Sequence, residues 1–463
     1  MISRIHSHMF FKMFFVCFLV LSYTFHLEAK DTENIPFEIK PVKKNSLGTL
    51  IYDVNKNSTL LSVNGDSSFK YASNVKMITA LTALEKLGGG FRFKTFFKYL
   101  PESKALYVKA GGNPEMVIEE MWRVAEELRS RGVDLIKRVV IDDFLYGENP
   151  HKLIPGSYDG DRSYQAYISP LPLNYNSVKI VVSKESDKKR PVVVNPKNKE
   201  IFSISNKAVF SKKGSLVVGT RKEGEKTGIV VRGSFSPERK TRVIYRKVFN
   251  PARHYIHTLV AFLQNETDIT VKREKIDNDF FSKGITYRHR SRPLREILRK
   301  MNLYSSNFIA DSVTFFMGTK IAGDPEKGVD ILRKHMLEKL DENVDIINGS
   351  GLGSGGNRLT PSFFIKLMKY AYKSPLLRVD FFSTLPVLGE EGTLEHIEAY
   401  EYRGKFRGKT GTLRGVSSIS GIMETKKGTT LLMTFVVNNF PEGNFKNMWR
   451  YRDEILRKIW RYY

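Results

Sequence analysis

Strand patterns lie near both ends of this 463-residue chain, and helical patterns lie between them. Near the N-terminus, two short strands are expected at 48–52 and 59–63, around a turn at 55–57. Near the C-terminus, two strands are expected at 416–423 and 429–438. This arrangement suggests one discontinuous α/β domain, an antiparallel sheet flanked by helices, with further domains inserted after its first helix.

Helices are predicted where apolar residues recur at helical spacing. The first runs from Ser73 to Leu87 and ends at three glycines, and its apolar positions are Val75, Ile78, Leu81, Leu84 and Leu87. Residues 91–182 give a mixed α/β pattern with a helix around 116–131 and a strand at 139–141. Later helices are predicted at 251–263, 293–301, 306–317 and 447–462. The last is amphipathic, and packing on the sheet is favoured over a position on a membrane.

The segment from 184 to 247 differs from its surroundings. Short β-like runs alternate with turns rich in lysine, arginine and glycine, and 18 basic residues outnumber 6 acidic ones. We expect a small basic β-rich domain here, nested in an α/β domain over 91–183 and 248–284. That domain is inserted in turn into the main domain, over 30–90 and 285–463. The excess charge fits attachment to an anionic partner or an ordinary solvated surface.

The first 29 residues have the pattern of a secretory signal peptide. Arg4 and Lys12 lie ahead of an apolar run from Met13 to Phe25, and the small residue Ala29 follows. The run has 13 residues, whereas a membrane-spanning helix needs about 20. We therefore expect export and cleavage after Ala29, with an uncleaved anchor as the alternative.

Composition narrows the chemistry of the exported chain. The only cysteine, Cys17, lies within the predicted signal peptide, so disulfides, zinc–cysteine sites and thiol catalysis are excluded from the mature protein. The formal net charge of +26 suggests an anionic partner. Export argues against nucleic acid, which leaves lipid headgroups and cell-wall polymers.

The first of three polar motifs is Ser73 with Lys76, at the start of the first helix. Positions i and i+3 share a helical face, so the hydroxyl and the amine can meet. Ser73 as an N-cap is the structural alternative, but the helix dipole disfavours a cation in the first turn. The same dipole, together with the expected nearness of Lys409, lowers the pKa of Lys76, as a general base requires.

The second motif is Ser305-Ser306-Asn307, ahead of an apolar helix, and the third is Lys409-Thr410-Gly411-Thr412, ahead of a strand. In the second, a hydroxyl and an amide can point into one cleft, although a helix N-cap would explain the same residues. In the third, an ammonium and a hydroxyl can hold a carboxylate, and Gly411 allows a substrate backbone to approach closely. A basic β-turn is the alternative for the third motif.

In this order the motifs match the S-x-x-K, Ser-x-Asn and K-T-G set of penicillin-binding proteins and β-lactamases. Over nearly all of its mature length the chain resembles the penicillin-binding protein 4 family of D-alanyl-D-alanine carboxypeptidases/endopeptidases, which are low-molecular-mass enzymes of class C. The first two motifs lie 232 residues apart, with room for the two inserted domains that mark this family. Other matching segments are 71–80, 111–114, 141–144, 169–174, 348–352, 385–389, 392–394 and 408–413.

The resemblance implies a serine β-lactamase/DD-peptidase-like fold and a serine peptidase of the cell wall. Ser73 would attack the carbonyl of a D-Ala-D-X bond in peptidoglycan stem peptides and form an acyl-enzyme. Lys76, neutral at that moment, would take its proton. Ser305 would pass the proton towards the leaving amine. β-Lactams would imitate the substrate and trap Ser73 covalently.

The resemblance also implies which residues bind the substrate. Asn307 would bind the acyl peptide, and Lys409, Thr410 and Gly411 would hold the terminal carboxylate. The backbone N–H groups of Thr412 and of the nucleophile would form the oxyanion hole. No metal and no cofactor is implied. The expected location is the bacterial periplasm, with peripheral association with an anionic envelope surface and no nucleic-acid partner.

The chain departs from the family pattern at three places. Asn348 stands where the family usually has aspartate. Glycines and a serine at 353–356 follow Leu352, where the family usually has an arginine. Arg358 could take the place of this arginine, but it more naturally precedes the next helix. The segment 395–397 lacks a second expected arginine. These departures concern recognition of the rest of the peptide.

Two alternative functions follow from the same residues. A β-lactamase-like hydrolase is disfavoured, because the Glu-x-x-Leu-Asn deacylation motif of class A enzymes is absent. A non-catalytic wall-binding protein that keeps the fold is favoured slightly by the missing arginines. The intact set of Ser73, Lys76, Ser305 and Lys409 counts against that second alternative.

Overall fold

The computed structural model describes residues 44–463 except 186–187, 265–267, 354 and 441–444. The predicted signal peptide and its cysteine lie outside these residues. Within the described ranges, no helix combines the length and the apolar character that crossing a membrane requires.

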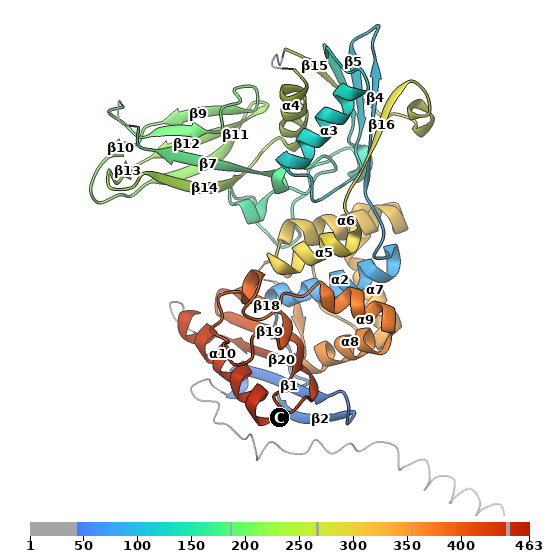
Figure 1. Cartoon of the computed structure of the whole chain (residues 1–463), viewed down its shortest axis with the longest axis vertical. Helices are drawn as coiled ribbons and strands as arrows, with labels where there is room; N and C mark the ends of the chain where they lie inside the picture. Colours follow the sequence, from blue (N-terminus) through green and yellow to red (C-terminus); the bar gives the residue numbers. More distant parts are fainter. Residues whose placement is uncertain (1–43, 186–187, 265–267, 354, 441–444) are drawn as a thin grey trace, which may run out of the picture. The chain divides into compact units, whose positions relative to one another are not determined.

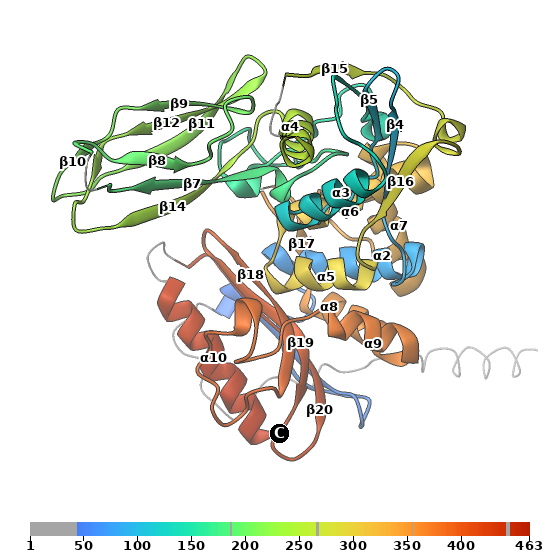
Figure 2. The same cartoon turned by 45° about the horizontal axis from the view of Figure 1, so that its top comes forward.

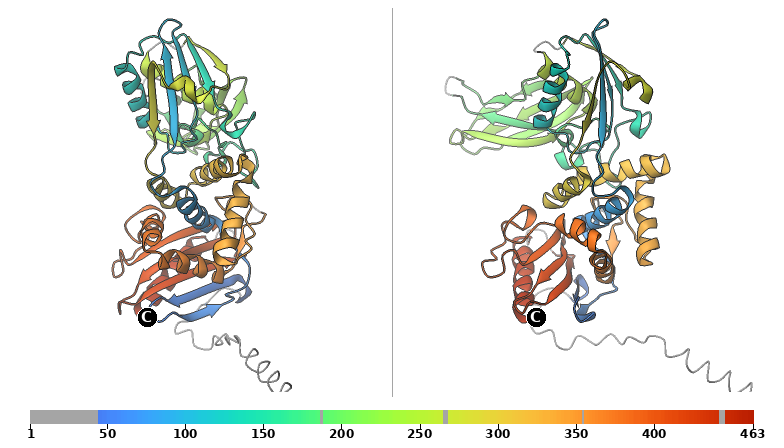
Figure 3. Two further views of the ribbon diagram at one scale, coloured as in Figure 1. Left: turned by 90° about the vertical axis from the view of Figure 1, so that its right-hand side faces the viewer. Right: turned by 45° about the vertical axis from the view of Figure 1, so that its right-hand side comes forward.

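A five-stranded antiparallel sheet is built from both ends of the described chain (Figure 1). Its order is β18 (Phe406–Leu413), β19 (Val416–Glu424), β20 (Thr430–Asn438), β1 (Leu47–Asp53) and β2 (Ser58–Val63). β1 pairs with β20 along its whole length, so that Leu50 lies opposite Thr434. Figure 3 shows the first strands in blue and the last in red within the same sheet. The predicted sheet from both chain ends is confirmed.

Helices cover both faces of this sheet (Figure 2). α10 (Phe445–Tyr462) packs on β19, and its apolar side chains Ile455, Leu456, Ile459 and Trp460 are buried. α8 (Pro361–Lys373) packs on β1 and β20. The amphipathic C-terminal helix therefore lies on the sheet, as the sequence favoured.

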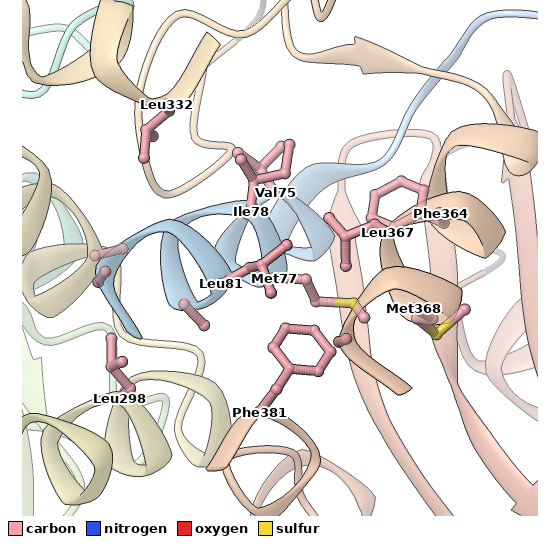
Figure 4. Packing of buried hydrophobic residues seen from close by; sticks show 14 of the residues in the cluster. Val75, Met77, Ile78, Leu81, Leu298, Leu332, Phe364, Leu367, Met368 and Phe381 are labelled. Atoms are coloured by element: carbon pink, nitrogen blue, oxygen red, sulfur yellow. The ribbon is translucent and has the colours of Figure 1, made fainter. Parts of the chain in front are cut away.

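The first predicted helix is α2 (Lys76–Leu87), and it lies at the centre of the main core. It contacts α5 (Leu294–Leu303), α6 (Asn307–Ala322), α7 (Gly328–Leu340) and α9 (Pro375–Ser383). Figure 4 shows its apolar side chains among those of the surrounding helices. Every residue from Lys76 to Leu84 is buried. A helix enclosed on all sides is a rigid support for the polar motif at its start.

A second five-stranded sheet is mixed, with two parallel and two antiparallel pairings. Its order is β15 (Thr270–Arg273), β6 (Arg138–Asp142), β5 (Ala105–Lys109), β4 (Lys94–Leu100) and β16 (Ile285–Arg290). α3 (Ile118–Ser130) and α4 (Pro251–Leu263) share a buried apolar core with it. α4 was predicted with these bounds.

The basic segment forms two three-stranded sheets that share a small apolar core. One holds β14 (Thr241–Lys247), β7 (Ser177–Ser183) and β8 (Val192–Asn195), and the other β11 (Val217–Glu223), β12 (Lys226–Arg232) and β9 (Phe202–Asn206). Two short pairs complete the strands: β10 (Val209–Phe210) with β13 (Ser234–Phe235), and β3 (Phe69–Lys70) with β17 (Arg358–Leu359). β7 pairs with β14 across the expected boundary at 183/184. The division into domains stays a prediction.

Candidate active site

Ser73 lies in a short 3-10 turn, Ala72–Val75, that leads into α2. The α-helix itself begins at Lys76, three residues later than predicted. Lys76 Nζ lies 2.9 Å from Ser73 Oγ, so the expected pairing of hydroxyl and amine is present. Ala72 has a φ of +50°, a conformation that costs a non-glycine residue about 1–3 kcal/mol and is typical of functional turns.

Lys76 is completely buried, and burial lowers its pKa from 10.5 to about 7. The negative charge of Asp311 opposes this shift. Burial, rather than the helix dipole invoked from the sequence, is thus the largest cause. A pKa near 7 leaves a large share of the lysine neutral at physiological pH, as a general base requires.

The partners of Lys76 orient its nitrogen. Nζ lies 2.7 Å from Asn307 Oδ1 and 2.7 Å from Ser350 O, and both of these atoms can only accept hydrogen bonds. A neutral amine has two N–H bonds and one lone pair. When the two N–H groups donate to these oxygens, the lone pair is left for the hydroxyl of Ser73. The arrangement suits proton transfer from serine to lysine.

The segment Gly349-Ser350-Gly351 holds this lysine in place. Gly349 O accepts a hydrogen bond from Thr79 Oγ1 at 2.7 Å, and Gly349 N–H donates to Asp311 Oδ1 at 2.8 Å. A Cβ on Gly351 would lie 2.0 Å from Ala72 O, which explains why glycine is required beneath the Ser73 turn. Burial raises the pKa of Asp311 to about 6.

Ser305 lies between Lys409 and the start of α6. Lys409 Nζ donates to Ser305 Oγ at 2.9 Å and to Thr410 O at 2.8 Å. Burial, and then the charge of Lys76, hold the pKa of Lys409 well below its usual value. The N-cap of α6 is Ser306, whose Oγ accepts from Ile309 N–H at 3.2 Å. The helix cap therefore accounts for Ser306 and leaves the hydroxyl of Ser305 to the site.

Gly411 brings β18 against the turn that carries Ser73. A Cβ at this position would lie 2.3 Å from both Tyr71 O and Ser418 Oγ. Asn74 Nδ2 donates to Ser418 Oγ at 2.7 Å, and Ser418 Oγ donates to Tyr71 O at 2.8 Å. The position that a Cβ of Gly411 would occupy thus faces the protein. The sequence had suggested that the missing side chain makes room for a substrate backbone. A substrate-binding role for Gly411 stays a prediction.

The other two residues of the third motif differ in exposure. Thr410 is buried, and its Oγ1 donates to Thr393 Oγ1 at 2.8 Å. Thr412 is exposed and pairs with Ser417 in the sheet. β18 is an edge strand, and an extended peptide can add to such an edge by main-chain hydrogen bonds. The predicted roles of Thr410 and Thr412 are compatible with these positions.

Asn348 uses its amide N–H groups, which the aspartate usual at this position in the family lacks. Its Nδ2 donates to Pro155 O at 2.7 Å and to Leu352 O at 2.6 Å, and its Oδ1 accepts from Gly351 N–H at 2.7 Å. A carboxylate cannot donate either of the first two bonds. The amide therefore stabilises the loop that follows Leu352.

Arg358, the candidate to replace the missing arginine, is bound to the backbone of Ser68. It lies in the short strand β17, and its guanidinium donates to Ser68 O at 2.6 Å from an exposed position. This confirms that Arg358 precedes the helix α8.

Three residues of this site were absent from the sequence prediction. Asp311 lies one helical turn after Asn307, and this spacing on an apolar helix was its only signal. Ser350 acts through its carbonyl oxygen, which carries no sequence signal. Thr393 lies in a segment that the family resemblance included without a role. Among the described residues, no three His, Cys, Asp or Glu side chains are grouped to hold a metal ion.

Comparison with known proteins identifies the family. The model of the D-Ala-D-Ala carboxypeptidase 3 (S13) family matches residues 36–458. A D-alanyl-D-alanine carboxypeptidase from Actinomadura sp. (strain R39) is 27% identical over 429 residues, which cover 86% of this chain and 78% of that protein.

Solved structures share the fold. Penicillin binding protein 4 (dacB) from Haemophilus influenzae has a TM-score of 0.75 at 17% identity, covering 90% of this chain and 96% of that one. A predatory endopeptidase from Bdellovibrio bacteriovorus has a TM-score of 0.55 at 18% identity, with 89% and 91% covered. Both the family resemblance and the predicted fold class are confirmed. The chain belongs to the D-Ala-D-Ala carboxypeptidase 3 (S13) family, and it is a serine-type D-Ala-D-Ala carboxypeptidase.

Proposed function

We propose that this carboxypeptidase acts on peptidoglycan stem peptides through an acyl-enzyme on Ser73. Neutral Lys76 takes the hydroxyl proton as Ser73 Oγ bonds to the carbonyl carbon of the penultimate D-Ala. The observation that carries this proposal is the buried amine 2.9 Å from the hydroxyl, because burial lowers the pKa of this amine to about 7. An ordinary exposed lysine would be charged at neutral pH and could not accept the proton.

The tetrahedral intermediate collapses with departure of the terminal amine. The proton held by Lys76 reaches that nitrogen through Ser305 Oγ, as the C–N bond breaks and the acyl-enzyme ester remains. Water then attacks the ester, and Lys76 accepts the water proton and returns it to Ser73 Oγ. The two products are the shortened peptide acid and a free D-amino acid. The N–H groups of Ser73 and Thr412 stabilise the oxyanion in both steps.

The carboxylate of the leaving residue is held by Lys409 and Thr410. A carboxylate beside Lys409 supplies an opposite charge to this buried amine, so substrate binding favours the ammonium form. Asn307 donates its amide N–H to the acyl peptide while its Oδ1 accepts from Lys76. Asn307 thus links substrate binding to the general base.

The matched variants Lys76→Met and Lys86→Met test this proposal. Both lysines lie on α2, but only Lys86 has an exposed side chain. D-Ala release from diacetyl-L-Lys-D-Ala-D-Ala is expected to fall by at least about a thousandfold in Lys76→Met and to stay unchanged in Lys86→Met. Full activity in a folded Lys76→Met protein would overturn the role of this lysine.

The same acyl-enzyme chemistry supports cleavage of D-Ala–diaminopimelate cross-links, because such a bond also follows a D-Ala carbonyl. The shared fold with an endopeptidase supports this activity. β-Lactams are expected to acylate Ser73, and a β-lactam complex of the Haemophilus protein has this fold as well. The substrate and the N-terminal pattern support export to the periplasm.

The basic segment is proposed to hold the enzyme near anionic envelope material. A cavity of about 200 Å³ in this segment is lined by Lys212, Lys213, Arg239 and Arg242, together with the acidic Glu238. Such charges act through salt-screened attraction. Reversal of Lys212, Lys213 and Arg239 to glutamate is expected to abolish salt-sensitive binding to isolated cell walls.

A matched control separates the effect of where the charges lie from the effect of the total charge. Lys272, Lys275 and Lys334 are exposed elsewhere on the chain, and their side chains are 65–77% exposed. Their reversal to glutamate changes the net charge equally and is expected to weaken wall binding far less. Equal losses in both triple variants would show that only net charge matters.

A further inference from the structure

A cavity of about 610 Å³ borders the active site on the side of the Ser305 motif. Its lining includes Ser305 and Asn307, which belong to the site described above, and the helix cap Ser306 between them. Other lining residues come from α3, β7, β14 and the 3-10 turn Ser163–Gln165. Its volume lies in the range of small-ligand sites.

Four tyrosines line this cavity, which we call the tyrosine groove: Tyr164, Tyr175, Tyr245 and Tyr304. Tyr304 is 67% exposed, Tyr245 52% and Tyr164 49%. Scattered exposed aromatics are ordinary, but several that line one cavity indicate a binding surface. Tyrosine offers a flat apolar face with a hydroxyl at its edge.

The fourth tyrosine is held in a strained turn. Asn174, Tyr175 and Asn176 have φ values of +49°, +57° and +50°. The turn is secured by Asn174 Oδ1, which accepts from Ile118 N–H at 3.0 Å, and the Tyr175 ring packs edge-on against Phe308. A left-handed conformation is unfavourable for a bulky residue. The fold thus keeps the Tyr175 ring against Phe308 at a cost, and such strain is typical of functional sites.

The charge of the groove limits what it can hold. Its charged lining residues are Glu119, Lys179 and Lys300, and Lys300 is paired with the buried Glu115. One carboxylate and one lysine remain, so the lining is close to neutral. An anionic ligand would find no excess of cations, whereas a neutral ligand with apolar faces and hydroxyl edges matches the tyrosines.

We infer that the tyrosine groove binds the N-acetylated sugar that carries the stem peptide. This inference rests on the proposed function, in which Asn307 binds the acyl side of the substrate. The glycan lies on that side, because the leaving D-amino acid departs towards Lys409. The N-acetylated sugar that carries the stem is N-acetylmuramic acid. Its carboxyl group forms the amide bond to the stem peptide and therefore carries no charge.

Three substrates test the inference: a disaccharide pentapeptide, the free pentapeptide, and diacetyl-L-Lys-D-Ala-D-Ala. We expect the intact protein to favour the disaccharide pentapeptide over the free pentapeptide by about tenfold in kcat/KM. Tyr245→Ala and Tyr164→Ala should bring this ratio close to one, and Tyr245→Phe should keep most of it because the ring remains. Tyr400→Ala removes a tyrosine that is 94% exposed elsewhere and should leave the ratio as it was.

A ratio of one in the unmodified protein would overturn the inference. The inference would also be overturned if the tyrosine variants lost only the preference for the free pentapeptide over diacetyl-L-Lys-D-Ala-D-Ala. That result would show that the tyrosine groove binds the peptide and not the sugar. A second measurement does not depend on catalysis. Calorimetric titration of Ser73→Ala with the N-acetylglucosaminyl-N-acetylmuramyl dipeptide should show binding that Tyr245→Ala abolishes. If the unmodified protein hydrolyses none of the three substrates but Ser73→Ala still binds the sugar, only the proposed function is refuted. If Ser73→Ala does not bind the sugar, the inference that the tyrosine groove binds it is refuted.

Discussion

Acylation by penicillin should rise with pH through the pKa of Lys76, because the neutral amine is the form that accepts the Ser73 proton. Burial lowers that pKa from 10.5 to about 7, and Asp311 limits the shift with its negative charge. The charged groups that bear on the lysine are thus Asp311 from α6 and Lys409 from β18. Asp311→Asn removes the charge that raises the pKa, so the midpoint of the profile should move to lower pH.

The size of the effect follows from the pKa. With a value of about 7, the neutral fraction is about 1% at pH 5, about half at pH 7 and nearly complete at pH 9. The acylation rate should therefore rise by at most about fiftyfold between pH 5 and 7, because protonation of Asp311 at acid pH lowers the pKa of Lys76, and only about twofold between pH 7 and 9. A lysine with the ordinary pKa of 10.5 would instead give a tenfold rise with every pH unit up to pH 9.

The assay is the second-order rate constant for acylation by benzylpenicillin, followed by rapid mixing between pH 5 and 9. The carboxylate of this penicillin stays ionised over the whole range, so the profile reports the enzyme. Circular dichroism at each pH checks that the protein remains folded. A flat profile, or a rise that continues to pH 9 without levelling, would refute the role assigned to the buried lysine.

Three further variants probe the parts that surround the serine. Asn348→Asp should lower the free energy of unfolding by about 2–4 kcal/mol, since a carboxylate cannot donate to the two carbonyls that the amide binds; an unchanged melting temperature would contradict this. Gly411→Ala should slow penicillin acylation at least tenfold, because its methyl group would lie 2.3 Å from Tyr71 O, and a normal rate would show that the strand can shift. With Arg358 directed to Ser68, simple diacyl and diaminopimelate-containing peptides should be cleaved with similar kcat/KM; a strong diaminopimelate preference that Arg358→Ala removes would show the opposite.

The sequence predicted most elements of the main sheet and its helices, because their apolar residues follow strict periodicities. β19 and β20 were expected within one residue of their bounds, and β1 and β2 were expected as a hairpin. β18 was missed, although it carries Lys409. Its lysine, threonines and glycines show no apolar alternation, since Gly411 is selected by contact with the Ser73 turn, which is distant in sequence.

The sequence indicated one local contact of the site but not the surroundings of its residues, and the roles assigned to those residues stay predictions. The spacing of Ser73 and Lys76 indicated a contact because that contact is local. The depth of burial that sets the pKa of Lys76, and its bond to Ser350 O, arise from packing between distant segments. Periodicity and motif spacing carry no information about a backbone carbonyl, so this part of the site required the structure.

The central claim is that Ser73 is the nucleophile, and mapping the penicillin adduct tests it most directly. The protein is incubated with benzylpenicillin, digested, and the peptide that gains the mass of the drug is identified by tandem mass spectrometry. The account predicts an adduct on Ser73 in the unmodified protein and none in a folded Ser73→Ala variant. An adduct on another residue, or labelling that persists in Ser73→Ala, would contradict it.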